Sequence, residues 1–421
     1  MNKNRIVWVM CALFVQFQSL VSAQDSLTVE VMKSHAFSFD IVKGELQGDG
    51  RAILNEAISN AHITMIGNSV NSKLEVDFTN ALFTILNSNQ YNKMILEIGG
   101  ISGSVINELT QKSDIVKELT HLNKKYLWQR NGNMIPPIPN LSYKGSAELI
   151  KNVAENDWSL FAAGIESWAS YKMLVDELYF NLPKKEQKEC MELYKRTSTL
   201  LDENYEEVVT ITIENLAQFM TTIQNSEIFM SFLHRMEAYE GNKELIYHFK
   251  KSLAYWRYYA EGNTFAKNKI SIGESSIRLA KSLKANNIDF EKDKFFIKMG
   301  ITHLSKGIAP NSFYGVGSMM TEMAKFHGNN ATLSIGVIPR YFERDGAIKD
   351  HLVESDLYFM GLFKDIIPLG KKEEWVLLDL RSFTEKYVYG GAVISEKLRR
   401  VIRSYDFIVI PKTDKKPEVN Y

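Results

Sequence analysis

Short apolar runs alternate with amphipathic stretches along much of the chain. The clearest run is His62–Gly67, and a second, Met94–Gly99, follows it. Between them apolar residues recur at helical spacing: Leu74, Phe78, Ala81, Leu82, Ile85 and Leu86. Short apolar runs that end in glycine are typical of strands buried on both faces, and steps of three and four residues are typical of a helix. The pattern therefore predicts a βαβ unit.

Later runs of the same kind extend this sheet. They are Leu160–Ile165, Phe295–Met299, Thr332–Val337, Trp375–Leu380 and Phe407–Ile410. Strands that alternate with helices indicate an α/β fold, with a mainly parallel central sheet flanked by helices. Residues 184–263 instead show helical spacing without a convincing strand. We therefore expect one core in two halves, residues 24–183 and 264–421, separated by an inserted helical subdomain.

Two further local features stand out along the chain. The aromatic run Tyr255–Tyr259 closes the helical insertion, and it either lines a ligand cleft or packs against a neighbouring element, with packing the more common outcome. The proline-rich stretch Ile135–Pro139 is predicted to be a stiff loop before the third strand.

The first two dozen residues have the three-part layout of an export signal. Lys3 and Arg5 precede ten apolar residues, Ile6–Val15, and Val21-Ser22-Ala23 offers small residues for cleavage. A bilayer span needs about 20 apolar residues, so this run favours a cleaved signal over an uncleaved anchor. We expect residues 1–23 to be removed and the mature chain to act in a periplasm or as a secreted protein.

Composition limits the partners of the mature chain. Loss of Lys3 and Arg5 reduces the 50 basic residues to 48, against 50 acidic ones, and no run of like charge is present. Nothing here favours nucleic acid or an anionic membrane. Cys190 is the one cysteine left after the signal, so no intrachain disulfide can form. The hydrophobic content of 45% indicates a folded protein. No second apolar stretch approaches membrane-spanning length, so we expect no stable membrane insertion of the mature chain.

Candidate chemistry gathers where the predicted strands end, because loops converge at the carboxyl edge of a parallel sheet. The first strand is followed by Asn68, Ser69 and Asn71, the second carries Glu97, the third leads to Glu166, and a later one leads to His303. Together they predict a cleft that takes a small-molecule ligand or substrate. Singly, each has an ordinary structural explanation, such as a helix cap or a hydrogen-bonded core histidine.

Other chemistry receives less support. Ser69 resembles a nucleophile at a strand-to-helix turn, with His303 as base and Glu97 as orienter, but Asn71 stands where that elbow needs glycine. The Gly99–Gly103 stretch is either a phosphate cradle or, more simply, a turn, since no P-loop lysine follows. The histidines show no zinc spacing, so neither a metal nor another cofactor is predicted. A divalent ion would require the fold to bring Glu97, Glu166 and His303 together.

Several segments resemble the erythromycin-esterase-like superfamily, which also includes ChaN-like haem-uptake and TraB-like proteins. They are HITMIG with NSVN, MILEIGG, FAAGIESWASYKMLVDELY, KFFIKMGITHLSKGIAP and FYGVGSMMTEMAKFHGN, and the resemblance spans roughly Ile63 to Val337. In that family the first strand ends in Gly-Glu-x-x-His, the second carries Glu, and a late strand ends in Gly-x-x-His. By resemblance, Glu97 and His303 match the family positions. Asn68 and Asn71 replace the first glutamate and histidine.

This substitution leaves two functions open. The resemblance implies an ester or lactone hydrolase in which the first-strand histidine activates water, and asparagine cannot accept a proton at neutral pH. One hypothesis is a hydrolase with an altered catalytic site, Glu97 and His303, with Asn68, Ser69, Asn71 and Glu166 contacting the substrate. The other is a non-catalytic descendant that binds a small molecule or an extracytoplasmic partner. A purely structural role for these residues is the third possibility.

The predicted signal can be tested on the protein made in its host cell. Intact-mass and N-terminal analysis should find a mature chain that begins at Gln24, because Val21-Ser22-Ala23 meets the small-residue requirement for cleavage. Replacement of Ala23 by a bulky residue, Ala23→Phe, should block processing, and the matched Gln24→Phe change should affect it less. A chain that keeps Met1 and sediments with membranes would contradict cleavage.

Overall fold

The computed structural model describes residues 27–68, 72–130, 133–207, 213–309, 313–328, 331–344, 346–354, 360–390, 394–415 and 418–421. The predicted export signal therefore lies outside the described residues. Within them, no helix combines the length and the apolar character that a membrane crossing requires.

A nine-stranded sheet forms the centre of the molecule. Its order is β2 (Glu45–Gln47), β1 (Ala36–Val42), β12 (Trp375–Asp379), β13 (Phe407–Ile410), β9 (Thr332–Val337), β3 (Ile63–Asn68), β8 (Phe295–Gly300), β4 (Lys93–Leu96) and β7 (Ser159–Ala162). From β13 to β7 all neighbours are parallel, and β2, β1 and β12 add antiparallel pairs on one side. The predicted α/β fold is confirmed, and all seven predicted strands are present.

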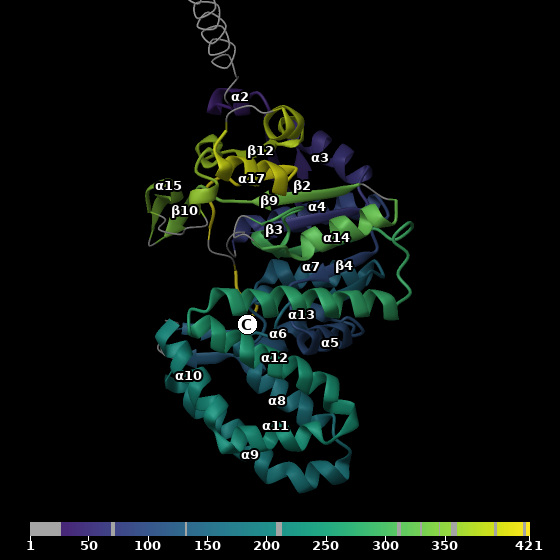
Figure 1. Ribbon diagram of the computed structural model, residues 1–421, viewed down its shortest axis with the longest axis vertical. Coiled ribbons are helices and arrows are strands. Elements are labelled where there is room, and N and C mark those ends of the chain that lie inside the picture. The colour runs from purple at the N-terminus through teal and green to yellow at the C-terminus, as the bar shows by residue number, and fades with distance from the viewer. Residues whose placement is uncertain are drawn as a thin grey trace, which may run out of the picture.

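Helices cover both faces of this sheet (Figure 1). Their bounds are α2 (Val29–Lys33), α3 (Asp49–Ser59), α4 (Lys73–Ser88), α5 (Gly100–Leu109), α6 (Ile115–Tyr126), α7 (Lys144–Glu155), α8 (Tyr171–Phe180), α9 (Lys184–Glu207), α10 (Ile213–Asn225), α11 (Glu227–Glu237), α12 (Lys243–Ala260), α13 (Thr264–Ala285), α14 (Val316–Phe326), α15 (His351–Glu354), α16 (Arg381–Phe383) and α17 (Glu396–Ser404). Two small hairpins lie outside the central sheet, β5 (Trp128–Arg130) with β6 (Asn133–Ile135), and β10 (Tyr341–Arg344) with β11 (Ala347–Asp350).

Alternation along the strands divides the core between the two faces. In β3, Ile63 and Met65 pack in one buried cluster with residues of α13 and α14. Ile66 belongs instead to the cluster that contains Phe78 and Leu82 of α4. Successive side chains of a strand point to opposite faces, so a central strand covered on both sides is apolar throughout. This explains the continuous apolar runs of the sequence.

Helices α9 to α12 form the end of the molecule away from α2 and α17 (Figure 1). Phe219, Phe232 and Phe249, from this helical region, belong to the same buried cluster as sheet residues such as Phe296. Described residues 184–285 contain no strand, and helical structure continues through α13 beyond the predicted boundary at 263. The helical region therefore shares its core with the sheet.

The C-terminal tail fastens the start of α4. Asp414 is buried, and its carboxylate accepts hydrogen bonds from the backbone N–H of Leu74 at 3.1 Å and of Lys415 at 2.9 Å. The N–H of Lys73 in turn donates to the carbonyl of Lys415 at 3.2 Å. Burial raises the pKa of Asp414 to about 6, with a smaller upward effect from the carboxylate of Glu75, while its hydrogen bonds act in the opposite direction.

This raised pKa predicts a pH dependence of stability. Folded Asp414 holds its proton up to about pH 6, whereas an unfolded aspartate loses it near 3.8. Its favourable contribution is therefore present below about pH 4 and is lost as the pH rises to 6. In urea unfolding from pH 4 to 7, the wild-type chain should lose on the order of 2 kcal/mol more than Asp414→Asn.

The exposed Glu373 supplies the control for this comparison. Glu373→Gln should follow the wild-type pH profile. A stability difference between wild type and Asp414→Asn that stays constant from pH 4 to 7 would contradict the raised pKa of Asp414.

Candidate functional site

The carboxyl ends of three adjacent parallel strands bring the predicted site residues to one edge of the sheet. Asn68 ends β3, Glu97 directly follows β4, and Gly300 ends β8. β8 lies between β3 and β4 in the sheet. A short 3-10 turn, Ile301–His303, begins after Gly300, so the histidine predicted from sequence comes to the same edge as Glu97.

Glu97 and His303 form the centre of this site. Oε1 of Glu97 lies 3.3 Å from Nε2 of His303, and the side chains are 28% and 25% exposed. Oε2 of Glu97 accepts a hydrogen bond of 2.6 Å from the N–H of Gly300. The carbonyl of Glu97 accepts another, of 2.9 Å, from Nδ2 of Asn140. The carboxylate is thus held in place and still reaches solvent together with the imidazole.

Glycines allow the backbone to make this arrangement. A Cβ at Gly164 would lie 2.8 Å from the carbonyl carbon of Glu97, and one at Gly315 would lie 2.5 Å from the carbonyl oxygen of His303. Any larger residue would push these segments away from Glu97 and His303. The contact between Glu97 and His303 therefore requires glycine at positions 164 and 315.

A cavity of about 250 Å³ opens beside Glu97. Its lining includes Pro137 and Asn140 of the proline-rich loop, and Tyr255 and Trp256 from the helical region. Burial, followed by the charge of Glu97, raises the pKa of Tyr255 well above the usual range. The phenol therefore stays neutral at physiological pH and can donate a hydrogen bond to a ligand.

Asn68 borders a smaller cavity of about 20 Å³ together with Glu97 and Lys298. Lys298 is nearly buried, and its ammonium lies 3.1 Å from Oε1 of Glu75 in the first turn of α4. Asn68 thus belongs to the same neighbourhood as the Glu97 and His303 pair. Ser69 and Asn71 lie outside the described residues, so their predicted contacts with substrate, and the nucleophile hypothesis for Ser69, stay predictions.

Glu166 does not join this group, and its carboxylate serves the fold. It is 1% exposed and accepts hydrogen bonds of 2.6 Å from the N–H of Ile101 and from Oγ of Ser102. A Cβ at Gly99 would lie 1.9 Å from its carboxyl carbon, so that glycine makes room for it. Burial raises the pKa of Glu166, and Ser102, Arg278 and the helix N–H groups oppose the shift.

This placement decides two of the sequence hypotheses. Gly99 is the N-cap of α5 and Gly103 lies in its second turn, and the anion at this helix start is the Glu166 carboxylate. The glycine stretch is therefore the start of a helix, so the simpler prediction of a turn was wrong. With Glu166 occupied in this way, the fold does not assemble the three-ligand ion site. Among the described residues, no group of three or more His, Cys, Asp or Glu side chains is placed to hold a metal.

Sequence reasoning undervalued several residues of the site. Tyr255 and Trp256 were more simply explained by packing, yet both line the cavity beside Glu97. Lys298 offered a usable signal, a charged residue inside an otherwise apolar strand. Asn140 gave no local signal, because its contact with Glu97 joins residues far apart in the sequence.

Comparison with solved structures finds the same overall fold in two proteins of low sequence identity. A histidine-to-asparagine mutant of erythromycin esterase EreC in its open conformation has a TM-score of 0.52 and 11% identity, with 90% of this chain and 98% of that chain covered. A succinoglycan biosynthesis protein has a TM-score of 0.51 and 14% identity, with 93% and 98% covered. No protein-family model matches the sequence, and comparison with curated proteins found no match.

These likenesses establish the fold. This chain has the same overall α/β fold as erythromycin esterase EreC, which confirms the predicted fold class. A match to the haem-binding ChaN of Campylobacter jejuni has a TM-score of 0.31, which is too low to carry an argument.

A structural role for Glu166 predicts a loss of stability on truncation. Glu166→Ala would leave the N–H groups of Ile101 and Ser102 without their acceptor. It would also remove the carboxylate whose charge acts most strongly on the pKa of Arg278. Urea unfolding should show a loss of about 3 kcal/mol. Glu148→Ala, at an exposed position of α7, should change stability by less than about 0.5 kcal/mol. Unchanged stability of Glu166→Ala with loss of ligand binding would instead identify Glu166 as a ligand contact.

Proposed function

We propose that this protein is an exported hydrolase of esterase-like chemistry, in which Glu97 and His303 act on water that attacks an ester or lactone carbonyl. The observation that carries the proposal is the 3.3 Å contact between the Glu97 carboxylate and Nε2 of His303, in a partly exposed pair at the sheet edge. The named esterase with the same fold makes ester cleavage the reaction to test first.

The geometry assigns separate tasks to the two side chains. With Nε2 of His303 directed at Glu97, the other ring nitrogen, Nδ1, is the atom that accepts a proton from water. The carboxylate orients the ring and stabilises the imidazolium that forms. Glu97 is itself fixed by the Gly300 N–H, so this orientation does not depend on the substrate.

The cavity beside Glu97 supplies the place for the substrate. Attack of water on the carbonyl carbon forms a tetrahedral oxyanion, which needs a hydrogen-bond donor. Tyr255 lines the cavity and stays protonated, so its hydroxyl is a donor of the right kind. Collapse of the oxyanion then breaks the bond to the leaving oxygen, and the imidazolium returns its proton to that oxygen.

One observation favours a second candidate, a binding protein without catalysis. Asn68 stands at the end of β3, where the family pattern has its first glutamate, and an amide cannot take up a proton at neutral pH. In a binding protein, Glu97, His303 and Tyr255 would recognise the polar groups of a small molecule. The proposed export is supported by the N-terminal sequence, which favours a periplasmic or secreted protein for either function.

A hydrolysis screen of the mature chain, residues 24–421, tests the proposal. Aryl esters and lactones, with erythromycin among them, should reveal activity that His303→Ala reduces by about 100-fold to 10,000-fold in kcat/KM, because the general base is removed. Glu97→Gln should also lower kcat, since the amide does not stabilise the imidazolium. His327→Ala, at an exposed position after α14, should leave kcat/KM unchanged.

The outcomes separate the two candidates. Hydrolysis that His303→Ala leaves intact would overturn the proposed role of the pair. Failure of the wild-type chain to cleave any substrate, combined with thermal stabilisation by a screened compound that His303→Ala abolishes, would establish the binding protein instead.

A further inference from the structure

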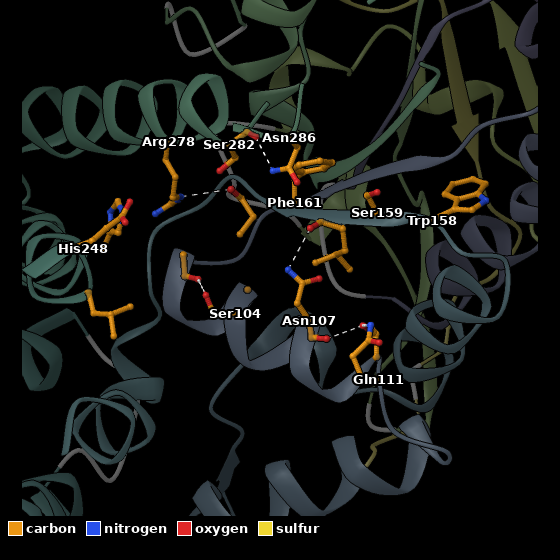
Figure 2. Close-up of a pocket in the computed structure, with 17 residues that line it drawn as sticks. Ser104, Asn107, Gln111, Trp158, Ser159, Phe161, His248, Arg278, Ser282 and Asn286 are labelled. Atoms are coloured by element: carbon orange, nitrogen blue, oxygen red, sulfur yellow. Dashed lines mark hydrogen bonds and ion pairs between the residues drawn. The ribbon is translucent and has the colours of Figure 1, made fainter. Parts of the chain in front are cut away.

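A second and larger cavity, of about 570 Å³, borders another face of α5. Gly100, Gly103 and Ser104 of that helix contribute to it, whereas Gly99 and Ser102 border the cleft beside Glu97. Figure 2 shows that the strand segment around Ser159 forms one wall of the cavity. The two long helices that carry His248 and Arg278 form others. The proposed hydrolase does not use this cavity.

Strand β7 presents peptide groups to the cavity. In the described residues it pairs with β4 alone, and the N–H groups of Ser159 and Ala163 donate to carbonyls on that side. Because peptide groups of a strand alternate in direction, those of Leu160 and Ala162 point the other way. Their carbonyls accept from Nδ2 of Asn107 at 3.3 Å and from Nε of Arg278 at 3.4 Å. The N–H groups of Leu160 and Ala162 point to the same side of the strand, and both residues line the cavity.

Arg278 is the main charged group of this wall. It is 8% exposed, and its guanidinium also donates to the carbonyl of Gly164. Burial lowers its pKa, and the carboxylates of Glu166, Glu274 and Glu244 oppose that shift. Within the described part of the chain, no carboxylate oxygen lies within 4.0 Å of a guanidinium nitrogen of Arg278. Buried charges are normally paired, so this guanidinium is suited to an anion.

The nearby carboxylates have other partners or lie in solvent. Glu166 is bound to the start of α5, and Glu274 pairs with Lys251 at 3.0 Å. The side chain of Glu244 is 79% exposed at the rim, where water screens its charge. Burial and the charge of Arg278 lower the pKa of His248, which is therefore neutral at pH 7 and available for hydrogen bonding.

Polar side chains complete the lining. Asn107, Gln111 and Asn286 supply amides, and Ser104 and Ser282 supply hydroxyls. Figure 2 shows Asn107 and Arg278 directed at the strand that forms one wall. An extended peptide could not pair with β7 there, because these two side chains already occupy the strand edge. The space suits a compact molecule with acceptor atoms.

From these contacts we propose that this cavity binds a small polar anion. Its carboxylate or phosphate group contacts the Arg278 guanidinium and the N–H groups of Leu160 and Ala162, and the amides of Asn107 and Gln111 contact the remainder. Arginine suits either group because its planar array of N–H donors matches two oxygens at once. The proposal is independent of catalysis at Glu97, because its evidence and its readout involve the other cavity.

Thermal unfolding of the mature chain with defined anions tests this binding. Sodium phosphate and sodium succinate are titrated separately against sodium chloride of equal ionic strength. At roughly ten times the dissociation constant, a specific anion should raise Tm by about 2 °C. A response to phosphate alone or to succinate alone identifies the group that Arg278 binds, and a response to both assigns a general oxyanion site.

Two variants make the test specific to this cavity. Ser104→Glu adds a negative charge at an exposed lining position, so it should preserve Tm in chloride and abolish the anion response. Arg278→Gln should also abolish it. The matched Thr84→Glu change, at an exposed position of α4 outside the cavity, should keep the full response. If Arg278→Gln does not fold, the anion response of Ser104→Glu still tests the proposed site.

Two results would overturn the proposal. The first is a Tm that neither phosphate nor succinate raises above the chloride value. The second is an equal rise in wild type, Ser104→Glu and Thr84→Glu, which would mean general salt stabilisation without a site.

Discussion

The buried carboxylate of Glu166 is the interaction on which the surroundings of both cavities depend. It connects the segment after β7 to the start of α5, and its own backbone binds α12, through Oγ of Ser252 at 3.1 Å and Nε1 of Trp256 at 2.7 Å. Arg278 of α13 adds an electrostatic contribution. A carboxyl group is costly to bury unless hydrogen-bond partners surround it, and here a helix start supplies them. This one group therefore fixes the walls between which ligands would bind.

Glu97 illustrates the opposite use of a carboxylate. It follows β4 much as Glu166 follows β7, but it stays partly exposed and contacts a histidine. Protein donors surround the carboxyl group of Glu166, whereas the carboxylate of Glu97 stays accessible to solvent and lines the cleft. The difference in burial, more than the difference in sequence position, separates an anchor from a group that can do chemistry.

Much of the fold could be predicted from sequence because central parallel strands are apolar on both faces. Thr332–Val337 and Phe407–Ile410 were predicted with their observed bounds. The antiparallel side was missed at β1, a partly exposed strand in which apolar and polar residues are mixed. The helical run was predicted to end near 263, yet α13 continues to Ala285, because helical spacing does not reveal where a helix docks.

The sequence by itself determined seven strands of the central sheet, the helical region and the sheet edge at which Glu97 and His303 lie. Local spacing encodes these features, since it sets which side chains a strand or helix directs inward. Only the tertiary structure decided that Glu97 and His303 touch, that Glu166 is buried, and that Tyr255 lines the cleft. Those outcomes depend on contacts between distant segments, and there glycines such as Gly164 and Gly315 set how closely the backbones approach.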